Sequence, residues 1–346
     1  MPWCRLDLDT HKTHERHPLM KLIKDFGDLL TNKVNLDDTR LNLLDSRVEA
    51  VFAVLKADEG IGSYVKDKIP QGSWAHRMVI RPAAGQEFDA DFLLRMEENP
   101  DWQDQPVEYL KYLRNVLASH ATYAKMPIKR KCRCVRLVYA GDCHLDIVAF
   151  VRRADGTTWI VNGDANEWEP TNPEGYTAWI GEKDGITSGN LRKVVRLLKF
   201  LRDRQGAFDM TRSIILTTIV GERVERWRDT TAPGYYADVP TTLLHVVADV
   251  DDWLQANPTK PSIADPSAPD ATFDHRWNNE TYETLREDIH RYRELIAEAF
   301  HAEGVTVSRD LWRNIFGTGF EPPQDSPSPG RFGVVPSTPS RSGRAG

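Results

Sequence analysis

The chain has 346 residues, of which 40% are hydrophobic and 28% are charged, an ordinary composition for a globular protein. Its 45 Lys and Arg against 51 Asp and Glu give a formal net charge of −6, which excludes the bulk basic field of a general nucleic-acid binder. No apolar run approaches the roughly 18 residues of a membrane span, the N-terminus lacks the apolar core of a secretion signal, and only four cysteines occur. We therefore expect a cytoplasmic protein without membrane contact.

The first half of the chain predicts a mixture of helices and strands. Residues 1–36 are a mostly polar N-terminal segment, and apolar residues at spacings of three and four then predict a helix over residues 41–55. A second helix is predicted over residues 108–120. Strands are predicted at residues 78–80, 88–94, 132–139, 144–150 and 157–161, with a tight turn at residues 140–142.

The second half predicts helices. They are expected at residues 191–204, 211–227, 239–256, 279–302 and 308–316. The last 26 residues contain six Pro, five Ser and four Gly, a composition that favours disorder. The sequence thus predicts an α+β protein with four parts: an N-terminal segment (1–36), a core of sheet and helices (37–189), a helical lobe (190–320) and a disordered tail (321–346).

Three carboxylates stand out on the predicted strands. Asp89 and Asp91 alternate with apolar residues, so they project from one face of their strand. Asp146 is the single acid in the apolar strand 144–150. Buried carboxylates that lie side by side repel each other unless a cation joins them, and Mg²⁺ prefers such oxygen ligands. If the two strands are neighbours, the three acids suit a pair of metal ions about 4 Å apart.

Phosphate-binding groups are predicted at two other places. Gly72 allows close approach of a ligand to the backbone, and Ser73 adds a hydroxyl and an N–H group. In the helix 191–204, Arg192, Arg196 and Lys199 form a basic stripe that suits a triphosphate, although a solvated helix face gives the same pattern.

Several patterns have a plainer interpretation. The acid pairs Asp7/Asp9 and Asp249/Asp251 are expected at the surface. A zinc cluster of Cys132, Cys134, Cys143 and His144 is disfavoured by its spacing, and buried free thiols are expected instead. The basic run from Lys125 to Arg136 indicates a charged edge strand rather than a site for an activating nucleic acid.

Together these motifs resemble the nucleotidyltransferases of the DNA-polymerase-β type. The resemblance is closer to the bacterial cyclic-oligonucleotide synthases, relatives of cyclic GMP–AMP synthase that work in anti-phage signalling. It spans residues 40–320. The matching pieces are Gln71–Ser73, Ile80–Pro82, Phe88–Asp91, Cys134–Arg136, His144–Val148, Trp168–Pro173, Leu197–Phe200, Ala264–Pro266, Arg276–Trp277 and Trp312–Gly317 with Phe320. It implies a polymerase-β-like core, a mixed sheet with flanking helices, packed against a helical C-terminal lobe.

The resemblance also implies roles for individual residues. Asp89, Asp91 and Asp146 would hold two Mg²⁺ ions, or Mn²⁺, and Asp146 would position or deprotonate the attacking ribose hydroxyl. The residues implied in nucleotide binding are Gln71, Gly72, Ser73, Lys199, Ser213, Arg192 and Arg196. One departure is the bulk of the residues after Ser73, since the family usually has small ones there and this chain has Trp74, His76, Arg77 and Met78.

The implied activity is conversion of NTPs into a cyclic di- or trinucleotide second messenger for anti-phage defence, with release of pyrophosphate. A downstream effector would sense the product, and a ubiquitin-transfer-like partner would act on Gly346. Two alternatives stay open. One is a template-independent enzyme that makes linear oligonucleotides or extends RNA. The other is a nucleotide-binding sensor with little or no turnover, which the bulky loop favours.

Overall fold

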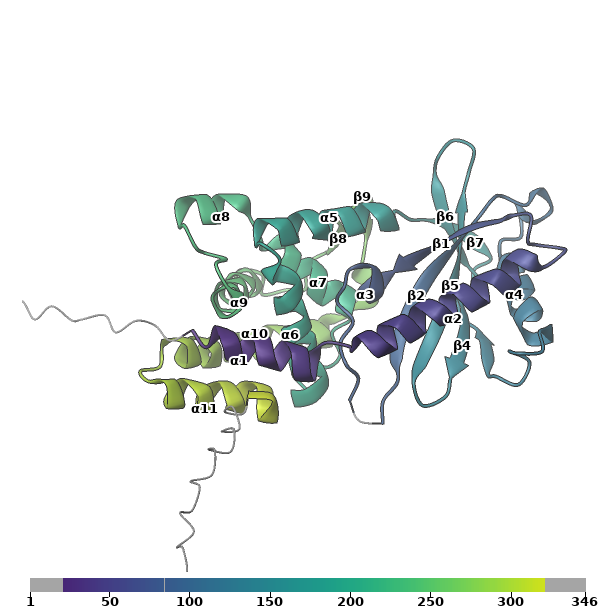
Figure 1. Cartoon of the computed structure of the whole chain (residues 1–346). Coiled ribbons are helices and arrows are strands. Elements are labelled where there is room, and N and C mark those ends of the chain that lie inside the picture. Colours follow the sequence, from purple (N-terminus) through teal and green to yellow (C-terminus); the bar gives the residue numbers. More distant parts are fainter. Residues whose placement is uncertain (1–20, 84, 321–346) are drawn as a thin grey trace, which may run out of the picture.

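The computed structural model describes residues 21–83 and 85–320. A mixed sheet with its own helices and a lobe built almost entirely of helices lie side by side, with the short helix α3 (Gly72–Ala75) between them (Figure 1). The tail at residues 321–346, Gly346 and the Asp7/Asp9 pair fall outside the described residues.

The sheet has seven strands and places the predicted strands 88–94 and 144–150 next to each other. Its strands are β1 (Val65–Gln71), β2 (Phe88–Met96), β3 (Ile128–Arg130), β4 (Val135–Tyr139), β5 (Cys143–Arg152), β6 (Thr158–Asn162) and β7 (Glu167–Pro170). The order is β1-β2-β5-β4-β3, with β6 paired to β5 and β7 paired to β6. Only the central β2–β5 pair is parallel. This arrangement confirms the mixed sheet expected from the sequence.

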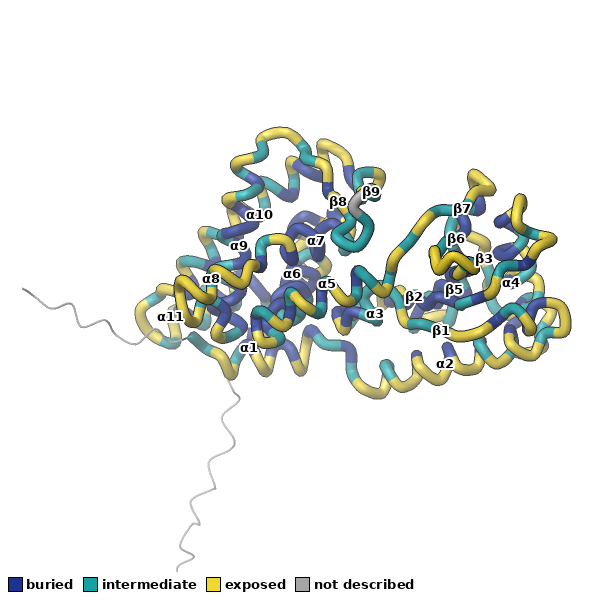
Figure 2. Tube along the Cα trace, turned by 90° about the horizontal axis from the view of Figure 1, so that it is seen from above, coloured by how far each residue is buried: buried dark blue, intermediate teal, exposed yellow. Residues whose placement is uncertain are grey.

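Two helices cover one face of the sheet. The helices α2 (Asp38–Ala57) and α4 (Val107–Ser119) confirm the predicted helices in this half of the chain, and the Asp37 side chain caps α2 by accepting a hydrogen bond from the Arg40 N–H. Alternate residues of β2 and β5, such as Phe92 and Ile147, are buried against these helices. Figure 2 shows α2 running along β1. The opposite residues of the same strands, which include the three aspartates, therefore face away from α2 and α4.

The helical lobe surrounds a second apolar core. Its helices are α1 (Ile23–Leu29), α5 (Pro173–Ile186), α6 (Asn190–Gln205), α7 (Ser213–Glu222), α8 (Arg226–Thr231), α9 (Val239–Ala256), α10 (Asn279–His301) and α11 (Val305–Phe316). A small hairpin is formed by β8 (Ala264–Asp265) and β9 (Ala268–Thr272). Phe26, near the N-terminus, packs edge-on against Trp312 of α11 with ring centroids 4.9 Å apart. The lobe thus confirms the helical second half.

Some elements differ from the sequence expectation. Helix α5 was not predicted, and its Ile180 joins the core of the helical lobe, as do Phe26 and Leu29 of the supposed polar N-terminal segment. The helical lobe therefore draws on residues that the predicted boundaries at 36 and 189 assign elsewhere. The predicted helix 211–227 is divided into α7 and α8, which are separated at Arg223–Glu225.

Among the described residues, five strands were missed, namely β1, β3 and β7 of the large sheet and both strands of the β8–β9 hairpin, and one strand was wrongly predicted. The missed strands β1, β3 and β7 contain few apolar residues, as in the β7 sequence Glu-Trp-Glu-Pro. The segment 78–80 does not join the sheet, since Ile80 forms a single bridge with Asn35. The acid pair Asp249/Asp251, expected at the surface, is buried. Asp249 pairs with Arg228 at 3.0 Å and Asp251 with Arg293 at 2.9 Å, and these partners compensate the burial.

Other expectations hold. Cys134 and Cys143 are buried free thiols, and Cys132 is a partly buried one. The basic run supplies β3, which is an edge strand of the sheet, with Lys129 and Arg130 exposed. Within the described residues, no helix combines the length and apolar character needed to cross a membrane.

Candidate active site

The predicted acids meet on the face of the sheet that α2 and α4 leave free. Asp91 of β2 lies directly opposite Asp146 of β5, and Asp89 lies opposite His144, one pair further along the same two strands. On the other side of β2, Gln71 at the end of β1 is opposite Asp91. Because directly opposed residues share a face, the sheet register gathers Asp89, Asp91, Asp146 and Gln71 at one place.

Arg136 forms ion pairs with two of the three carboxylates, Asp146 and Asp89. Arg136 of β4 is opposite Asp146, and its guanidinium donates to both Asp146 oxygens, from Nε to Oδ1 at 2.7 Å and from Nη2 to Oδ2 at 2.8 Å. The same Nη2 lies 3.3 Å from Asp89 Oδ1. Asp146 is buried, whereas Asp89 is exposed. A two-point contact of this kind is among the stronger and more directional ion pairs in proteins.

The ionised form of Asp91 is disfavoured by burial and by its acidic neighbours. Burial, together with the neighbouring Asp146 and Asp89 carboxylates, raises the pKa of Asp91 to about 7 against the opposing effect of Arg136 and Lys199. A carboxylic acid with this pKa gains from any cation that enters the cluster and neutralises its neighbours.

Gly72 approaches this cluster closely. Its backbone has φ of +60°, the left-handed region that favours glycine, and a Cβ atom added there would lie 2.9 Å from Asp91 Oδ2. The sequence suggested that Gly72 permits the approach of a ligand. In the structure, it also permits the approach of the backbone to Asp91.

Lys199 of α6 joins the helical lobe to the loop that follows β1. Its ammonium group donates to Ser73 Oγ at 3.0 Å and to the Met78 carbonyl oxygen at 2.8 Å. Burial, together with Arg202, lowers the pKa of Lys199 to about 8, whereas the nearby Asp203 and Asp91 oppose the shift. The predicted Gly72–Ser73 pair and Lys199 thus belong to one site.

Three of the four bulky residues after Ser73 are packed into the protein, whereas Arg77 is exposed. Trp74 is partly buried against the core under α2 and α4, and Met78 is buried in the core of the helical lobe. His76 is buried beside Tyr176, with ring centroids 5.1 Å apart. Burial, helped by Arg192 and Lys199, lowers the pKa of His76 to about 4, so this imidazole is neutral at pH 7. Bulk at these three positions therefore fills core space.

The remaining predicted residues have protein partners of their own. Arg192 donates to Asp184 Oδ2 at 2.7 Å, and Ser213 Oγ accepts a hydrogen bond from Arg202 at 3.1 Å. Arg196 is different. Burial lowers the pKa of its guanidinium, and its Nε has no hydrogen-bond partner among the described residues. In the basic stripe, the positive charges of Arg196 and Lys199 are thus less compensated by protein carboxylates than that of Arg192.

The donor chemistry of the acids fits a divalent cation. Three carboxylates on adjacent strands supply only oxygen atoms, which Mg²⁺ prefers, and the raised pKa of Asp91 reflects their crowding. Within residues 21–83 and 85–320, however, no three His, Cys, Asp or Glu side chains already surround a point as metal ligands. The contacts of Arg136 with Asp146 and Asp89 give the physical reason, since they turn these carboxylates toward a guanidinium.

Two residues of the site were not identified from the sequence. Arg136 was noted only as part of a motif and of the basic run. His144 was noted as part of a motif and weighed as a zinc ligand. It bridges Glu87 and Asp89, with Nε2 2.6 Å from Glu87 Oε2 and Nδ1 3.1 Å from Asp89 Oδ1. The alternation rule did place His144 on the face of Asp146, and the register between the strands is the missing information.

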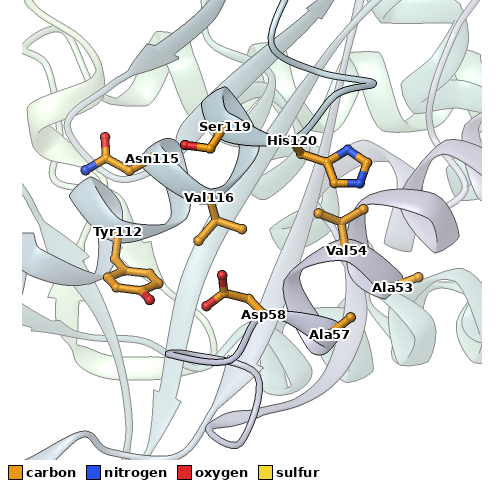
Figure 3. A pocket seen from close by; sticks show the side chains of 9 residues that line it. All are labelled: Ala53, Val54, Ala57, Asp58, Tyr112, Asn115, Val116, Ser119 and His120. Carbon is orange, nitrogen blue, oxygen red and sulfur yellow. The ribbon is translucent and has the colours of Figure 1, made fainter.

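A surface hollow lies elsewhere on the molecule. It has a volume of about 680 Å³ between α2 and α4, and its lining includes Val54, Asp58, Tyr112 and His120 (Figure 3). It contains none of the predicted site residues. Since α2 and α4 cover the face of the sheet opposite the aspartates, this hollow is separate from the candidate active site.

Comparison with known proteins finds similarity to enzymes that make oligonucleotide second messengers. Residues 20–184 match the profile of the Second Messenger Oligonucleotide or Dinucleotide Synthetase domain. The chain is 28% identical over 224 residues to a c-di-GMP synthase of Roseivirga ehrenbergii, which covers 57% of this chain and 59% of that protein. It is 25% identical over 188 residues to a cyclic AMP-AMP-GMP synthase of Enterobacter hormaechei, with 53% and 48% covered. The matches thus span about half of the length of these curated relatives.

The fold has a close counterpart among solved structures. The Bradyrhizobium diazoefficiens CD-NTase CdnG, solved in complex with GTP, superposes with a TM-score of 0.66 over 86% of this chain and 96% of that one, at 20% identity. This similarity confirms the predicted polymerase-β-like sheet with flanking helices and its helical lobe.

Proposed function

We propose that this chain, whose residues 20–184 belong to the second messenger oligonucleotide or dinucleotide synthetase family, joins NTPs into a cyclic di- or trinucleotide and releases pyrophosphate. The observation that carries the proposal is the assembly of Asp89, Asp91 and Asp146 on one sheet face beside Gly72 and Lys199. The curated relatives are a c-di-GMP synthase and a cyclic AMP-AMP-GMP synthase, which agrees with this activity. The product would serve as a second messenger in anti-phage defence.

In this proposal, the triphosphate of one nucleotide binds between the loop after β1 and helix α6. Ser73 and the backbone at Gly72 bind phosphate oxygens, and the Lys199 ammonium neutralises their charge from the side of the helical lobe. Arg196 adds a guanidinium whose Nε lacks a partner among the described residues. Arg192, Gln71 and Ser213 complete the proposed nucleotide-binding residues, and Arg192 and Ser213 must exchange protein contacts for nucleotide contacts.

The three aspartates would hold the Mg²⁺ ions, or Mn²⁺ in their place. When bound, such ions neutralise charge on the phosphate oxygens of the reacting groups. A ribose hydroxyl of a second nucleotide attacks the α-phosphorus, its O–P bond forms, and the bond from the α-phosphorus to the pyrophosphate oxygen breaks. Asp146 positions this hydroxyl or accepts its proton, because it lies directly opposite Asp91 on the neighbouring strand. Repetition of the transfer on the linear product closes the ring.

The structure of the loop after Ser73 bears on the alternative of a sensor without turnover. That alternative rested on the bulk of Trp74, His76, Arg77 and Met78. Arg77 is exposed, and the other three side chains are packed into the protein. The alternative of RNA extension would need an RNA-binding surface larger than the local basic run. Arg133 and Arg136 of the basic run are instead paired with Glu169 and Asp146. Neither alternative is favoured by a specific contact.

The partners follow from the activity. The NTPs are the substrates, and a downstream effector would sense the cyclic product. Conjugation of Gly346 by a ubiquitin-transfer-like partner remains part of the proposal, although this residue lies outside the described range.

Pyrophosphate release tests the proposal. The purified protein is incubated with all four NTPs and Mg²⁺ or Mn²⁺, alongside Asp89→Asn and Asp91→Asn variants. We expect release by the wild-type protein and its loss in both variants as a fall in kcat, not only as a rise in KM. Asp104→Asn, which removes a carboxylate from an exposed position, is the matched control and should retain activity. Full activity of the Asp89 and Asp91 variants would refute the metal site.

A further inference from the structure

The guanidinium of Arg136 pairs with two carboxylates of the proposed metal site, Asp146 and Asp89. Arg136 is held opposite Asp146 by the register of β4 and β5, so its backbone position is fixed by the sheet. Its guanidinium uses Nε and Nη2 to reach the two oxygens of one buried carboxylate, at 2.7 Å and 2.8 Å. The positive charge of Arg136 therefore lies beside the carboxylates and reduces their mutual repulsion.

The same guanidinium also pairs with a second acid, Asp89. Nη2 lies 3.3 Å from Asp89 Oδ1, so Arg136 lies between two of the three proposed metal ligands. Both oxygens of Asp146 are engaged, and each bond directs a lone pair toward arginine. A divalent ion needs at least one of those oxygens at about 2.0–2.1 Å in the case of Mg²⁺. The ion and the present arrangement of Arg136 thus compete for the same atoms.

Nothing else in the described part of the chain would keep Arg136 in place once a divalent ion arrived. Besides the aspartates, the polar partner of the Arg136 guanidinium among the described residues is His144, whose Nδ1 lies 3.4 Å from Nη1. A nearby arginine of the same segment behaves differently. Arg133 is bound at two points to Glu169, with Nε–Oε2 at 2.5 Å and Nη2–Oε1 at 2.9 Å, and Glu169 is not part of the cluster.

We propose that Arg136 is a built-in competitor of the divalent cation, which holds Asp146 and Asp89 in the metal-free protein and must release them when the ion binds. The proposal rests on the metal site of the proposed function. It explains why three acids on one sheet face do not surround a common point in the present structure. It also makes Arg136 a positioning residue, which sets the metal affinity of the protein through Asp146 and Asp89.

Direct measurement of Mn²⁺ binding tests this role without any turnover. The full chain is freed of metal with EDTA, and the free Mn²⁺ in a titration is followed by electron paramagnetic resonance in the absence of nucleotide. We expect Arg136→Met to tighten Mn²⁺ binding by about tenfold or more, since removal of the arginine leaves the carboxylates unpaired. Arg136→Lys keeps the charge and loses the two-point contact, so its affinity should fall between those of Arg136→Met and the wild type.

Arg133→Met is the matched control. It removes one positive charge from the same segment but leaves the contacts of Asp146 and Asp89 intact, so its effect measures the general change in electrostatic field. Weaker Mn²⁺ binding by Arg136→Met, or an affinity no tighter than that of Arg133→Met, would overturn the competitor role while leaving the metal site standing. If neither the wild-type protein nor Arg136→Met binds Mn²⁺, both the competitor role and the metal site of the proposed function fail. Should Arg136→Met not fold, the comparison of Arg136→Lys with the wild type decides in the same way.

Discussion

Lys199 of α6 and Ser73 of α3 are 126 residues apart in the sequence, and the Lys199 ammonium donates a hydrogen bond to the Ser73 hydroxyl at 3.0 Å. This contact links the helical lobe to the loop beside the three aspartates. The Lys199 ammonium also bonds the Met78 carbonyl oxygen, so the loop is held at two points. The position of the proposed phosphate site thus depends on both halves of the chain.

Replacement of Lys199 tests this link. Lys199→Met removes a buried charge that would bind the triphosphate, and we expect kcat/KM for pyrophosphate release to fall by about 30- to 300-fold. Lys193→Met is the control on the same helix, because Lys193 donates to Asn190 and has no contact with Ser73. Equal losses in the two variants would contradict a specific role for Lys199.

The contact between Gly72 and Asp91 gives a second prediction. Gly72→Ala places a Cβ atom 2.9 Å from Asp91 Oδ2 and strains a residue with φ of +60°, so we expect loss of most activity and weaker Mn²⁺ binding. Gly156→Ala is the matched control, since Gly156 has φ of +86° and nothing within 4 Å of an added Cβ. Both substitutions carry a backbone cost of about 1–2 kcal/mol. Only the Gly72 variant should lose Mn²⁺ affinity, and equal effects would show that strain alone is responsible.

The pKa of Asp91 predicts how the stability of the metal-free protein depends on pH. Burial raises this pKa to about 7 in the folded state, against an ordinary value near 3.9 in the unfolded chain. A raised carboxyl pKa means that the contribution of Asp91 is fully present below about pH 4 and is lost as the pH rises through 7. Between pH 5 and pH 8, the free energy of unfolding should therefore fall by about 2–3 kcal/mol through this group.

Urea unfolding in EDTA at a series of pH values measures this loss. Asp91→Asn cannot ionise, so its stability relative to the wild type should improve as the pH rises from 5 to 8. Asp104→Asn, at an exposed position, should follow the wild-type curve. A constant difference in the free energy of unfolding between Asp91→Asn and the wild type over this range would mean that the pKa of Asp91 is not raised in the folded protein.

The sequence predicted those parts of the fold where side chains carry a strong local pattern. Alternation of apolar and acidic residues identified β2 and β5, and with them Asp89, Asp91 and Asp146. Strand β1 was missed because it has only two large apolar residues, Val65 and Ile69, and a proline. Helix α5 was missed because its sequence contains three glycines, which weaken the helical signal.

Site residues were predicted where their spacing along the chain was informative. Contacts between them were missed where they depend on the order of the strands or on the packing of the lobe. Ser73 and Lys199 were both proposed as phosphate ligands, but their mutual contact follows from the packing of the lobe against the sheet. The contact of Arg136 with Asp146 required the knowledge that β4 is the neighbour of β5. A one-residue change of register would turn Arg136 to the opposite face of the sheet, and no short motif encodes that choice.

The product of the reaction tests the central claim most directly. The protein is incubated with all four NTPs, and with each NTP omitted in turn, in the presence of Mg²⁺, and the products are treated with alkaline phosphatase and analysed by mass spectrometry. We predict a phosphatase-resistant product with the mass of a cyclic di- or trinucleotide, formed together with pyrophosphate and absent from the Asp91→Asn reaction. Linear oligonucleotides alone, or no pyrophosphate with any divalent ion, would contradict the account.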